Sequence, residues 1–290
     1  MLNGVITKGI GGFYYVDTGH EVYECRARGK FRLDNITPMV GDRVEIEVND
    51  ATKQGYLINI KERKNSMVRP TIANVDQVII VAAAKKPDIN MLLLQKLLVY
   101  TEFLGLKIVV CINKIDLDEE KEYLKIANML WKVPYEVILS SAKQNKGIDE
   151  LREALKNKVS VFAGPSGAGK STLLNLVQSG LSLKTGDLSK KIDRGTHTTR
   201  HAELIKLDFG GMVADTPGFT SLDLTIIDQD KLKSCFPEFE AFSVCRFSSC
   251  MHHKEPQCGV KDAAAKGEIH EERYKYYIAF LEELKNYRRY

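Results

Sequence analysis

The chain has 290 residues, of which 44% are hydrophobic and 28% charged, and its formal net charge is +4. This composition excludes a fibrous or intrinsically disordered protein and predicts two or three folded domains. No apolar run approaches the ~18 residues of a membrane span, and the first residues, MLNGVITKGIGG, lack the basic and apolar regions of a secretory signal. We therefore expect a cytoplasmic protein with reduced cysteines and no membrane partner.

Residues 1–65 contain five short β-type runs: GVITKGI, GFYYVDT, EVYECRAR, DRVEIEVN and GYLINIKER. Gly-rich and polar turns separate these runs at the spacing expected of a small barrel or sandwich. The segment ECRARGKFR places Arg26, Arg28, Lys30 and Arg32 at alternate positions of a predicted strand and turn. Alternation puts side chains on one face, as a surface that contacts nucleic-acid phosphates needs. Basic strand faces are also commonly only solvated, so both interpretations stay open.

Residues 66–225 change to short apolar runs of the kind found in buried, parallel sheets. These predicted strands are VDQVIIVAAA, LKIVVCI, YEVILS, VSVFAG, AELIKLD and GGMVADT. Helical patterns alternate with the earlier strands: MLLLQKLLVYTEFLG, EKEYLKIANMLWK, DELREALKN and KSTLLNLVQSG. Alternation of strands and helices predicts an α/β sheet.

Residues 226–290 contain no further strand pattern. They carry a cluster of cysteines and histidines and end in a predicted helix, HEERYKYYIAFLEELKNYRRY. We therefore predict a third, mostly helical domain, with boundaries near residues 66 and 226.

A phosphate-binding loop is predicted at GPSGAGKS, where Gly164, Gly169, Lys170 and Ser171 fit the pattern G-x-x-x-x-G-K-[ST]. The pattern follows the strand VSVFAG and opens a helix, which is the context that this motif requires. Backbone N–H groups and the helix N-terminus would hold phosphates there. We expect Lys170 to reach the outer phosphates and Ser171 to bind Mg²⁺. The expected nucleotide-contacting residues are Gly164, Pro165, Ser166, Gly167, Ala168, Gly169, Lys170, Ser171 and Thr172.

The base-reading residues are predicted at INKID, directly after the strand LKIVVCI. The Asp116 carboxylate can accept two hydrogen bonds from guanine, from N1–H and the exocyclic amine, whereas adenine offers no such pair. Asn113 is expected to bridge the base edge and neighbouring loops, and the Lys114 stem to cover the ring. The segment SSAK follows another strand and adds Ser141, Ala142 and Lys143, with the Ala142 N–H directed at the guanine carbonyl oxygen. Three short motifs at strand ends together predict GTP as the nucleotide.

Two further segments are expected to respond to the γ-phosphate. In ADTPGF, Asp215 supplies a carboxylate that acts on Mg²⁺, and Gly218 can offer its N–H to the γ-phosphate. The segment RGTHTTRH contains threonines suited to Mg²⁺ and γ-phosphate, of which Thr199 is preferred and Thr198 is second. The predicted magnesium site consists of Ser171, Thr199 and Asp215.

The position after the DxxG motif, where Ras-like enzymes carry a water-orienting glutamine, is Phe219. Phenylalanine cannot orient water, so hydrolysis is either slow until a partner helps or uses another side chain. His197 is the best local candidate because it titrates near neutrality; a simple surface role is equally open. The candidate catalytic residues are therefore His197, Lys170 and Thr199.

The motifs occur in the order NKxD, SAK, P-loop, switch threonine and DxxG. Ordinary GTPases begin with the P-loop, yet the cyclic order is the same and only the cut point differs. This pattern, with NKID at 113–116, GPSGAGKS at 164–171, RGTHTTRH at 194–201 and DTPGF at 215–219, resembles the bacterial ribosome small-subunit-dependent GTPase A (RsgA/YjeQ) family over almost the full length. The fold class expected is a circularly permuted α/β P-loop GTPase.

The resemblance implies an N-terminal OB-fold RNA-binding domain over 1–65, a permuted GTPase domain over 66–225 and a zinc-binding domain over 226–290. It also implies binding to the small ribosomal subunit and its rRNA, and a role in late subunit maturation. GTP hydrolysis would be weak alone and stimulated by the subunit. Other assembly factors stay open as further partners, and a monomer is expected.

The segment CRFSSCMHHKEPQC places Cys245, Cys250, His252 and Cys258 within fourteen residues. Three thiolates and one imidazole form a closed tetrahedral set, which indicates one structural Zn²⁺ per chain. His253 is an alternative to His252. A short segment of such low apolar content needs the metal to stay folded.

Two other functions compete with a ribosome-stimulated GTPase. The first is an RNA-binding module whose GTP is a ligand with incidental hydrolysis, an alternative that Phe219 keeps open. The second is a P-loop kinase or ATPase, against which the guanine-reading carboxylate of Asp116 argues.

Overall fold

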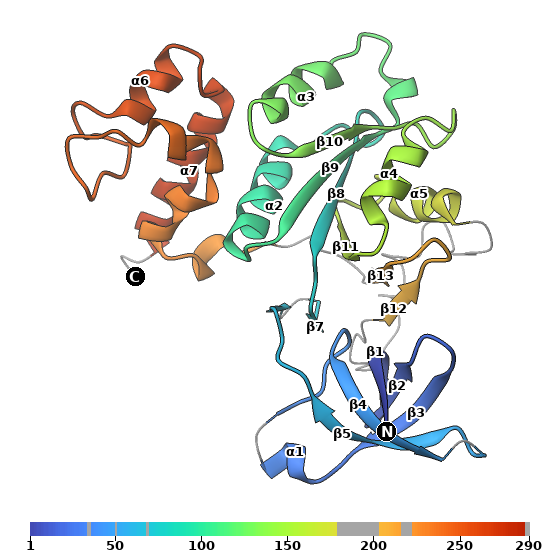
Figure 1. Ribbon diagram of the computed structural model, residues 1–290. Helices are drawn as coiled ribbons and strands as arrows, with labels where there is room; N and C mark the ends of the chain where they lie inside the picture. Colours follow the sequence, from blue (N-terminus) through green and yellow to red (C-terminus); the bar gives the residue numbers. More distant parts are fainter. Residues whose placement is uncertain (34–35, 50, 68–69, 179–202, 216–221, 288–290) are drawn as a thin grey trace. The chain divides into compact units, whose positions relative to one another are not determined.

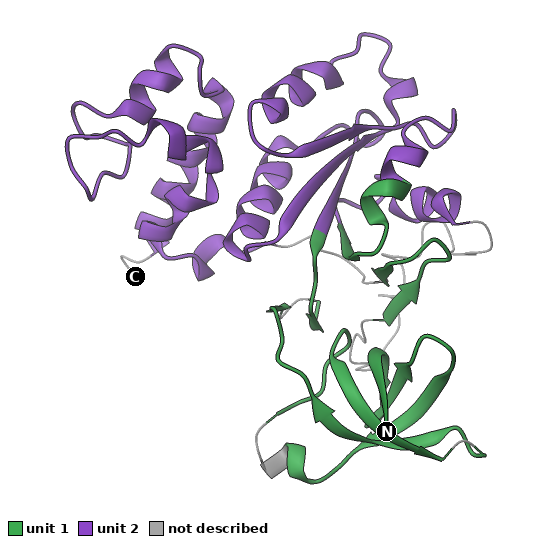
Figure 2. Ribbon diagram, in the orientation of Figure 1, with its two compact units in different colours: residues 1–77, 152–162, 184–219 green, residues 78–151, 163–183, 220–290 purple. Residues whose placement is uncertain are grey.

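The structure is a computed structural model (Figure 1), which describes residues 1–33, 36–49, 51–67, 70–178, 203–215 and 222–287. The chain forms two compact units (Figure 2). The first unit contains residues 1–77, 152–162 and 184–219, and the second contains 78–151, 163–183 and 220–290. The units group segments by contact, and the domain boundaries near residues 66 and 226 stay predictions.

A five-stranded barrel opens the first unit. Its strands are β1 (Leu2–Ile10), β2 (Phe13–Asp17), β3 (Val22–Ala27), β4 (Arg43–Asn49) and β5 (Gln54–Ile60). Antiparallel pairs β1–β2, β2–β3, β4–β5 and β1–β4 and the parallel pair β3–β5 close the barrel. Its interior is filled by side chains from alternate positions, and fully buried ones include Ile6, Val16, Cys25, Val44, Ile46 and Leu57. The predicted small barrel is confirmed.

The predicted alternation of basic residues ends with β3. The short helix α1 (Lys30–Leu33) begins three residues after that strand, so Lys30 and Arg32 do not continue its alternation. Arg26 lies over the Phe13 ring, with 4.6 Å from its guanidinium carbon to the ring centroid. Arg28 forms an ion pair with Glu47. The prediction that all four basic residues share one strand face is therefore wrong, because the chain forms a helix after β3.

The rest of the first unit extends from the barrel. Strands β6 (Ser66–Met67) and β7 (Ile72–Ala73) form a small hairpin. Strand β11 (Val159–Ala163) is parallel to β13 (Met212–Asp215), whereas β12 (Glu203–Lys206) is antiparallel to β13. The prediction that β12 belongs to a parallel set is thus wrong. The turn between β12 and β13 is too short for the crossover that parallel strands need.

The β12–β13 hairpin joins the barrel through β12. Lys8 of β1 pairs with Glu203 of β12 in an antiparallel register. Their side chains also form an ion pair, with 2.9 Å between Nζ and Oε2. A second ion pair joins Lys206 to Asp17 at 3.0 Å. The hairpin and the barrel are therefore held together by backbone and side-chain contacts.

The second unit contains strands β8 (Gln77–Ala83), β9 (Lys107–Asn113) and β10 (Glu136–Leu139), in the order β10-β9-β8. Strand β8 is buried along its whole length, as the continuous apolar run predicts. Helix α2 (Met91–Phe103) packs on β9, and α3 (Tyr123–Trp131) on β10. The short helix η1 (Ile115–Leu117) lies between β9 and α3 in the sequence. Helices α4 (Ile148–Leu155), whose residues from 152 onward belong to the first unit, and α5 (Lys170–Val177) follow.

The C-terminal region is mostly helical, as predicted. Short 3₁₀ helices η2 (Leu224–Ile226), η3 (Gln229–Cys235) and η4 (Pro237–Phe242) precede α6 (Gly259–Ala265) and α7 (Glu271–Tyr287). Helix α7 contacts η2, η3, α2 and α6. Within the described residues, none of the helices combines the length and apolar character needed to cross a membrane.

A buried arginine holds this region against α2. Arg273 of α7 is 0% exposed. Its Nε donates to Glu238 Oε1 at 2.6 Å and its Nη1 donates to Gln95 Oε1 at 2.6 Å. The guanidinium carbon also lies 4.5 Å from the centroid of the Phe236 ring. One charge thereby joins α7, η4 and α2, elements that are far apart in the sequence.

We predict that Arg273→Ala destabilises the second unit by about 3–5 kcal/mol, because it leaves the Glu238 carboxylate buried without its partner. The measurement is urea unfolding followed by the fluorescence of Trp131, the single tryptophan, which lies in this unit. The control is Lys275→Ala, which removes an exposed ion pair with Glu271 on the same helix and should change the midpoint little. Equal midpoints for the two variants would contradict the prediction.

Candidate functional site

The loop after β11 has the backbone that a phosphate-binding loop needs. Gly164 has φ +131°, and a Cβ there would lie 2.1 Å from the Val81 carbonyl oxygen. Gly169 has φ +99°, and its Cβ would lie 2.3 Å from Asn113 Nδ2. No side chain fits at either position, so the glycines let the loop pass close to β8 and β9. Helix α5 then begins at Lys170.

Lys170 is a buried cation at the start of this helix, with 8% of its surface exposed. Its Nζ donates to the carbonyl oxygens of Gly164 and Pro165, both at 2.8 Å. Burial lowers the pKa of the ammonium group. Among the described residues Lys170 has no carboxylate partner, and burying an unpaired charge is costly. The loop is therefore suited to an anion that supplies the missing negative charge.

Asn113, at the end of β9, connects this loop to two others. Its Nδ2 donates to the carbonyl oxygen of Ala168 at 2.9 Å. Its Oδ1 accepts from Ser140 Oγ at 3.2 Å and from the Ala142 N–H at 3.4 Å. The side chain is 1% exposed. One amide thus links the P-loop and the SSAK segment to the NKID segment.

The two charged residues of NKID make further contacts with the same loops. Lys114, in the left-handed region at φ +60°, donates from Nζ to the carbonyl oxygen of Gly167 at 2.6 Å and also to that of Lys86. Asp116 Oδ1 accepts from Ser141 Oγ at 2.6 Å, and Ser141 Oγ accepts in turn from the N–H of Gln144 at 3.1 Å. These bonds fix the direction of the carboxylate. Lys143, the last residue of SSAK, is exposed.

A second cluster lies in the C-terminal region, where the ligand atoms of Cys245, Cys250, His252 and Cys258 all lie within 4.8 Å of one another. Cys245 Sγ is 3.7 Å from Cys258 Sγ, and His252 Nδ1 is 3.3 Å from Cys258 Sγ. A tetrahedral zinc with Zn–S bonds of ~2.3 Å separates two sulfurs by about 3.8 Å. The donor set and its spacing therefore fit zinc.

Comparison with known proteins decides which family combines these features. A family model described as RsgA GTPase matches residues 60–225, and one described as RsgA N-terminal domain matches residues 3–57. The chain belongs to the RsgA GTPase family. It is 50% identical over 290 residues to the "Small ribosomal subunit biogenesis GTPase RsgA" of Clostridium perfringens, with 99% of each chain covered. A relative of the same description from Caldanaerobacter subterraneus is 50% identical, and the match covers 98% of this chain and 96% of the relative.

Two solved structures share the fold. YjeQ from Thermotoga maritima has a TM-score of 0.86 at 41% identity, with 98% of both chains covered. YloQ, described as a circularly permuted GTPase, has a TM-score of 0.84 at 38% identity, covering 99% of this chain and 96% of that one. The predictions of family, permuted GTPase fold and N-terminal OB-like barrel are confirmed. As a member of the RsgA GTPase family, the chain is a GTP hydrolase.

The structure does not describe every predicted site residue. Asp215 is the last residue of β13, and its side chain lies outside the described part. The predictions for His197, Thr198, Thr199, Gly218 and Phe219 fall in segments 179–202 and 216–221, which also lie outside the described residues. The P-loop, NKID and SSAK predictions, in contrast, fall on described residues that the fold brings together.

Supporting residues of the cysteine cluster were not predicted from the sequence. Tyr274 and Tyr277 of α7 donate from their hydroxyls to the carbonyl oxygens of His252 and Met251. The Phe239 ring meets the His252 ring edge to face, with centroids 5.8 Å apart. The two tyrosines are three residues apart, which places both on one helix face. This spacing is the signal in the sequence that could have indicated their shared role.

The two neighbouring histidines differ in their surroundings. His252 is 4% exposed and points its Nδ1 at the thiols. His253 instead has its Nε2 3.6 Å from Glu282 Oε1. The two histidines are distinguished by their three-dimensional surroundings, which their adjacent positions in the sequence do not reveal.

We predict that His252→Ala loses the zinc of the purified protein, whereas His253→Ala retains about one zinc per chain. Removing one of four ligands opens the tetrahedral set, and an exchange at His253 leaves all four in place. Metal content by atomic emission gives the result. Retention of zinc by His252→Ala together with loss from His253→Ala would reverse the assignment.

Proposed function

We propose that the chain binds and hydrolyses GTP at the loops joined by Asn113. The observation that carries the proposal is that Lys170 is buried and has no carboxylate partner among the residues that the structure describes. It lies on the same loop that Asn113 and Lys114 contact. The β- and γ-phosphates of GTP would supply the missing charge, and Asp116, already fixed by Ser141, would read the guanine edge. The Ala142 N–H, whose bond to Asn113 is long, has capacity for the guanine carbonyl oxygen.

The magnesium ion is assigned to Ser171, Asp215 and Thr199. Ser171 is 7% exposed and follows Lys170 at the start of α5, the position from which a hydroxyl reaches a phosphate-bound cation. The remaining nucleotide contacts are those of the P-loop from Gly164 to Thr172, of Lys143 and of Gly218. Zinc bound by Cys245, Cys250, His252 and Cys258 would have a structural role, because four protein ligands leave no open position.

The partner we propose is the small ribosomal subunit, since relatives 50% identical over the full length are described as small ribosomal subunit biogenesis GTPases. Such a partner implies action in the cytoplasm and contact with rRNA through the barrel and the zinc-binding region. Late maturation of the subunit would then be the step at which GTP is hydrolysed.

Asp116→Asn tests the base-reading residue. We expect the affinity for GTP to fall about a hundredfold, ~3 kcal/mol, because the carboxylate loses two hydrogen bonds from guanine. Affinity for xanthosine triphosphate should rise, since its second carbonyl can accept a bond from the new amide. Binding is measured with a fluorescent nucleotide, and Asp149→Asn, an exposed change on α4, is the control. Unchanged GTP affinity in Asp116→Asn would remove this residue from the base site.

Steady-state GTP hydrolysis with and without purified small subunits tests the function. We expect stimulation by the subunits with GTP and none with ATP. His197→Ala should lower the stimulated rate about tenfold or more if the imidazole orients water, while GTP binding stays unchanged. Equal slow turnover with and without subunits would favour a GTP-binding module with incidental hydrolysis. Full stimulation of His197→Ala would exclude only the catalytic role of that residue.

A further inference from the structure

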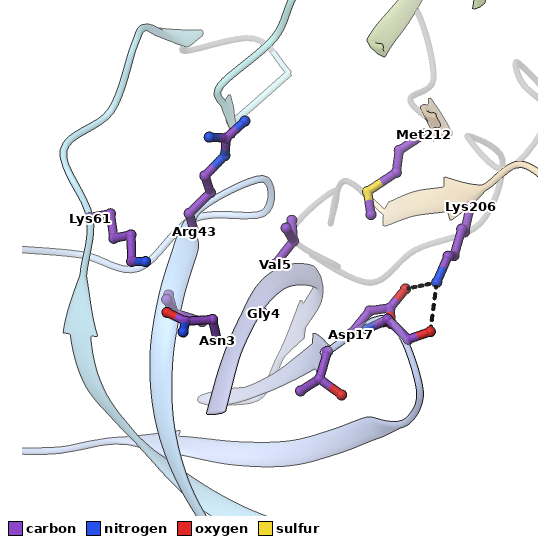
Figure 3. A pocket seen from close by; sticks show the side chains of 11 residues that line it. Asn3, Gly4, Val5, Asp17, Arg43, Lys61, Lys206 and Met212 are labelled. Atoms are coloured by element: carbon purple, nitrogen blue, oxygen red, sulfur yellow. Dashed lines mark hydrogen bonds and ion pairs between the residues drawn. The ribbon is translucent and has the colours of Figure 1, made fainter. Parts of the chain in front are cut away.

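A pocket of about 380 Å³ lies within the first unit, between the barrel and the β12–β13 hairpin (Figure 3). The barrel contributes residues from the start of β1, the end of β2 and the start of β4, and the hairpin contributes Lys206 and Met212. Small-molecule sites in proteins have volumes of roughly 300–1,000 Å³. The pocket is therefore large enough for a ligand of modest size.

The pocket is lined by an excess of positive charge. Arg43, Lys61 and Lys206 face it with a single carboxylate, that of Asp17. Asp17 is already satisfied by Lys206, at 3.0 Å, and by the N–H of Gly19, at 2.7 Å. In the described part of the chain, neither Arg43 nor Lys61 makes an ion pair. Two unpaired cations at one hollow raise the local concentration of anions.

The remaining side chains of the lining are the polar Asn3 and Thr18 and the apolar Val5, Val44 and Met212. Figure 3 shows Arg43 and Lys61 on one side of the pocket, Met212 and Lys206 on the other, and Val5 between them. Val44 also borders the pocket but is 0% exposed, so Val5 and Met212 provide the apolar surface that a ligand can reach. Methionine adapts its shape to flat groups. A bare phosphate would use only the cations, whereas a nucleotide offers a phosphate and a flat, largely apolar base.

We propose that this pocket binds one nucleotide unit, with its phosphate on Arg43 and Lys61 and its base against Val5 and Met212. The unit is either a free nucleotide or one residue of a single-stranded RNA, which present the same chemistry. None of the lining residues belongs to the P-loop, NKID or SSAK segments, so the site is additional to the proposed GTP site. It also differs from the segment of Arg26 and Arg28, where Glu47 pairs with Arg28.

The test uses the full chain at low salt with GDP and Mg²⁺ saturating the GTP site. The probes are UMP, followed by NMR, and a labelled six-residue oligouridylate, followed by fluorescence anisotropy. Uracil is chosen because the guanine-reading carboxylate does not recognise it. The variant is Arg43→Ala with Lys61→Ala, and the matched control is Lys64→Ala with Lys156→Ala, two exposed cations of the same unit outside the pocket.

We expect the pocket variant to bind at least one probe about tenfold more weakly than the parent, and the control to change by less than twofold. Loss of UMP binding would identify a free nucleotide as ligand, and loss of oligouridylate binding alone would identify an RNA strand. Equal affinities of variant and control for both probes, or no binding of either probe to the parent, would overturn the proposal. Arg43 and Lys61 are exposed, so the variant should melt at the parent's temperature. Its GTP hydrolysis without subunits should also be unchanged, which separates this test from that of the GTPase.

Discussion

The amide side chain of Asn113 is the contact on which the proposed nucleotide site depends. It donates to the P-loop and accepts from the SSAK segment, so that three loops share one buried group. An aspartate in its place would lose the donor and bring a buried charge, and a leucine would leave the Ala168 carbonyl and the Ala142 N–H without this partner. Buried polar groups of this kind fix geometry when every bond is made. The segments proposed to read the base and to bind the phosphates are thereby joined through one side chain.

This arrangement explains why the permuted chain order does not disturb the site. NKID follows β9, SSAK follows β10 and the P-loop follows β11, and each segment contributes from the carboxyl end of its strand. The contacts of Asn113 and Lys114 with Ala168 and Gly167 span more than fifty residues of sequence. A GTPase site is therefore defined by which strand ends meet, and the chain can be cut elsewhere without changing those neighbours.

Much of this fold follows from the sequence because its signals are local. Apolar runs correctly indicated the strands, and Gly164 and Gly169 indicated a loop whose close backbone approaches exclude side chains. The exceptions depend on contacts that a local pattern does not contain. Arg273 lies in a charged stretch, EERYKYY, that is typical of a solvated helix, yet it is fully buried against Glu238. The short helices η2 to η4 and α6 depend on packing, and the basic alternation failed where α1 begins.

The hairpin of β12 and β13 connects the barrel to two segments with predicted GTPase motifs. Its first strand begins two residues after segment 194–201, and its second ends at Asp215, where DTPGF begins. Each strand of the hairpin is four residues long, and Glu203 of β12 is paired with Lys8 of the barrel. Because Lys8 pairs with the first residue of β12, a change in position at the start of this strand would act directly on the edge of the barrel. The barrel is thus joined, through β12, to the hairpin that lies in the sequence between the two segments we propose to contact the γ-phosphate.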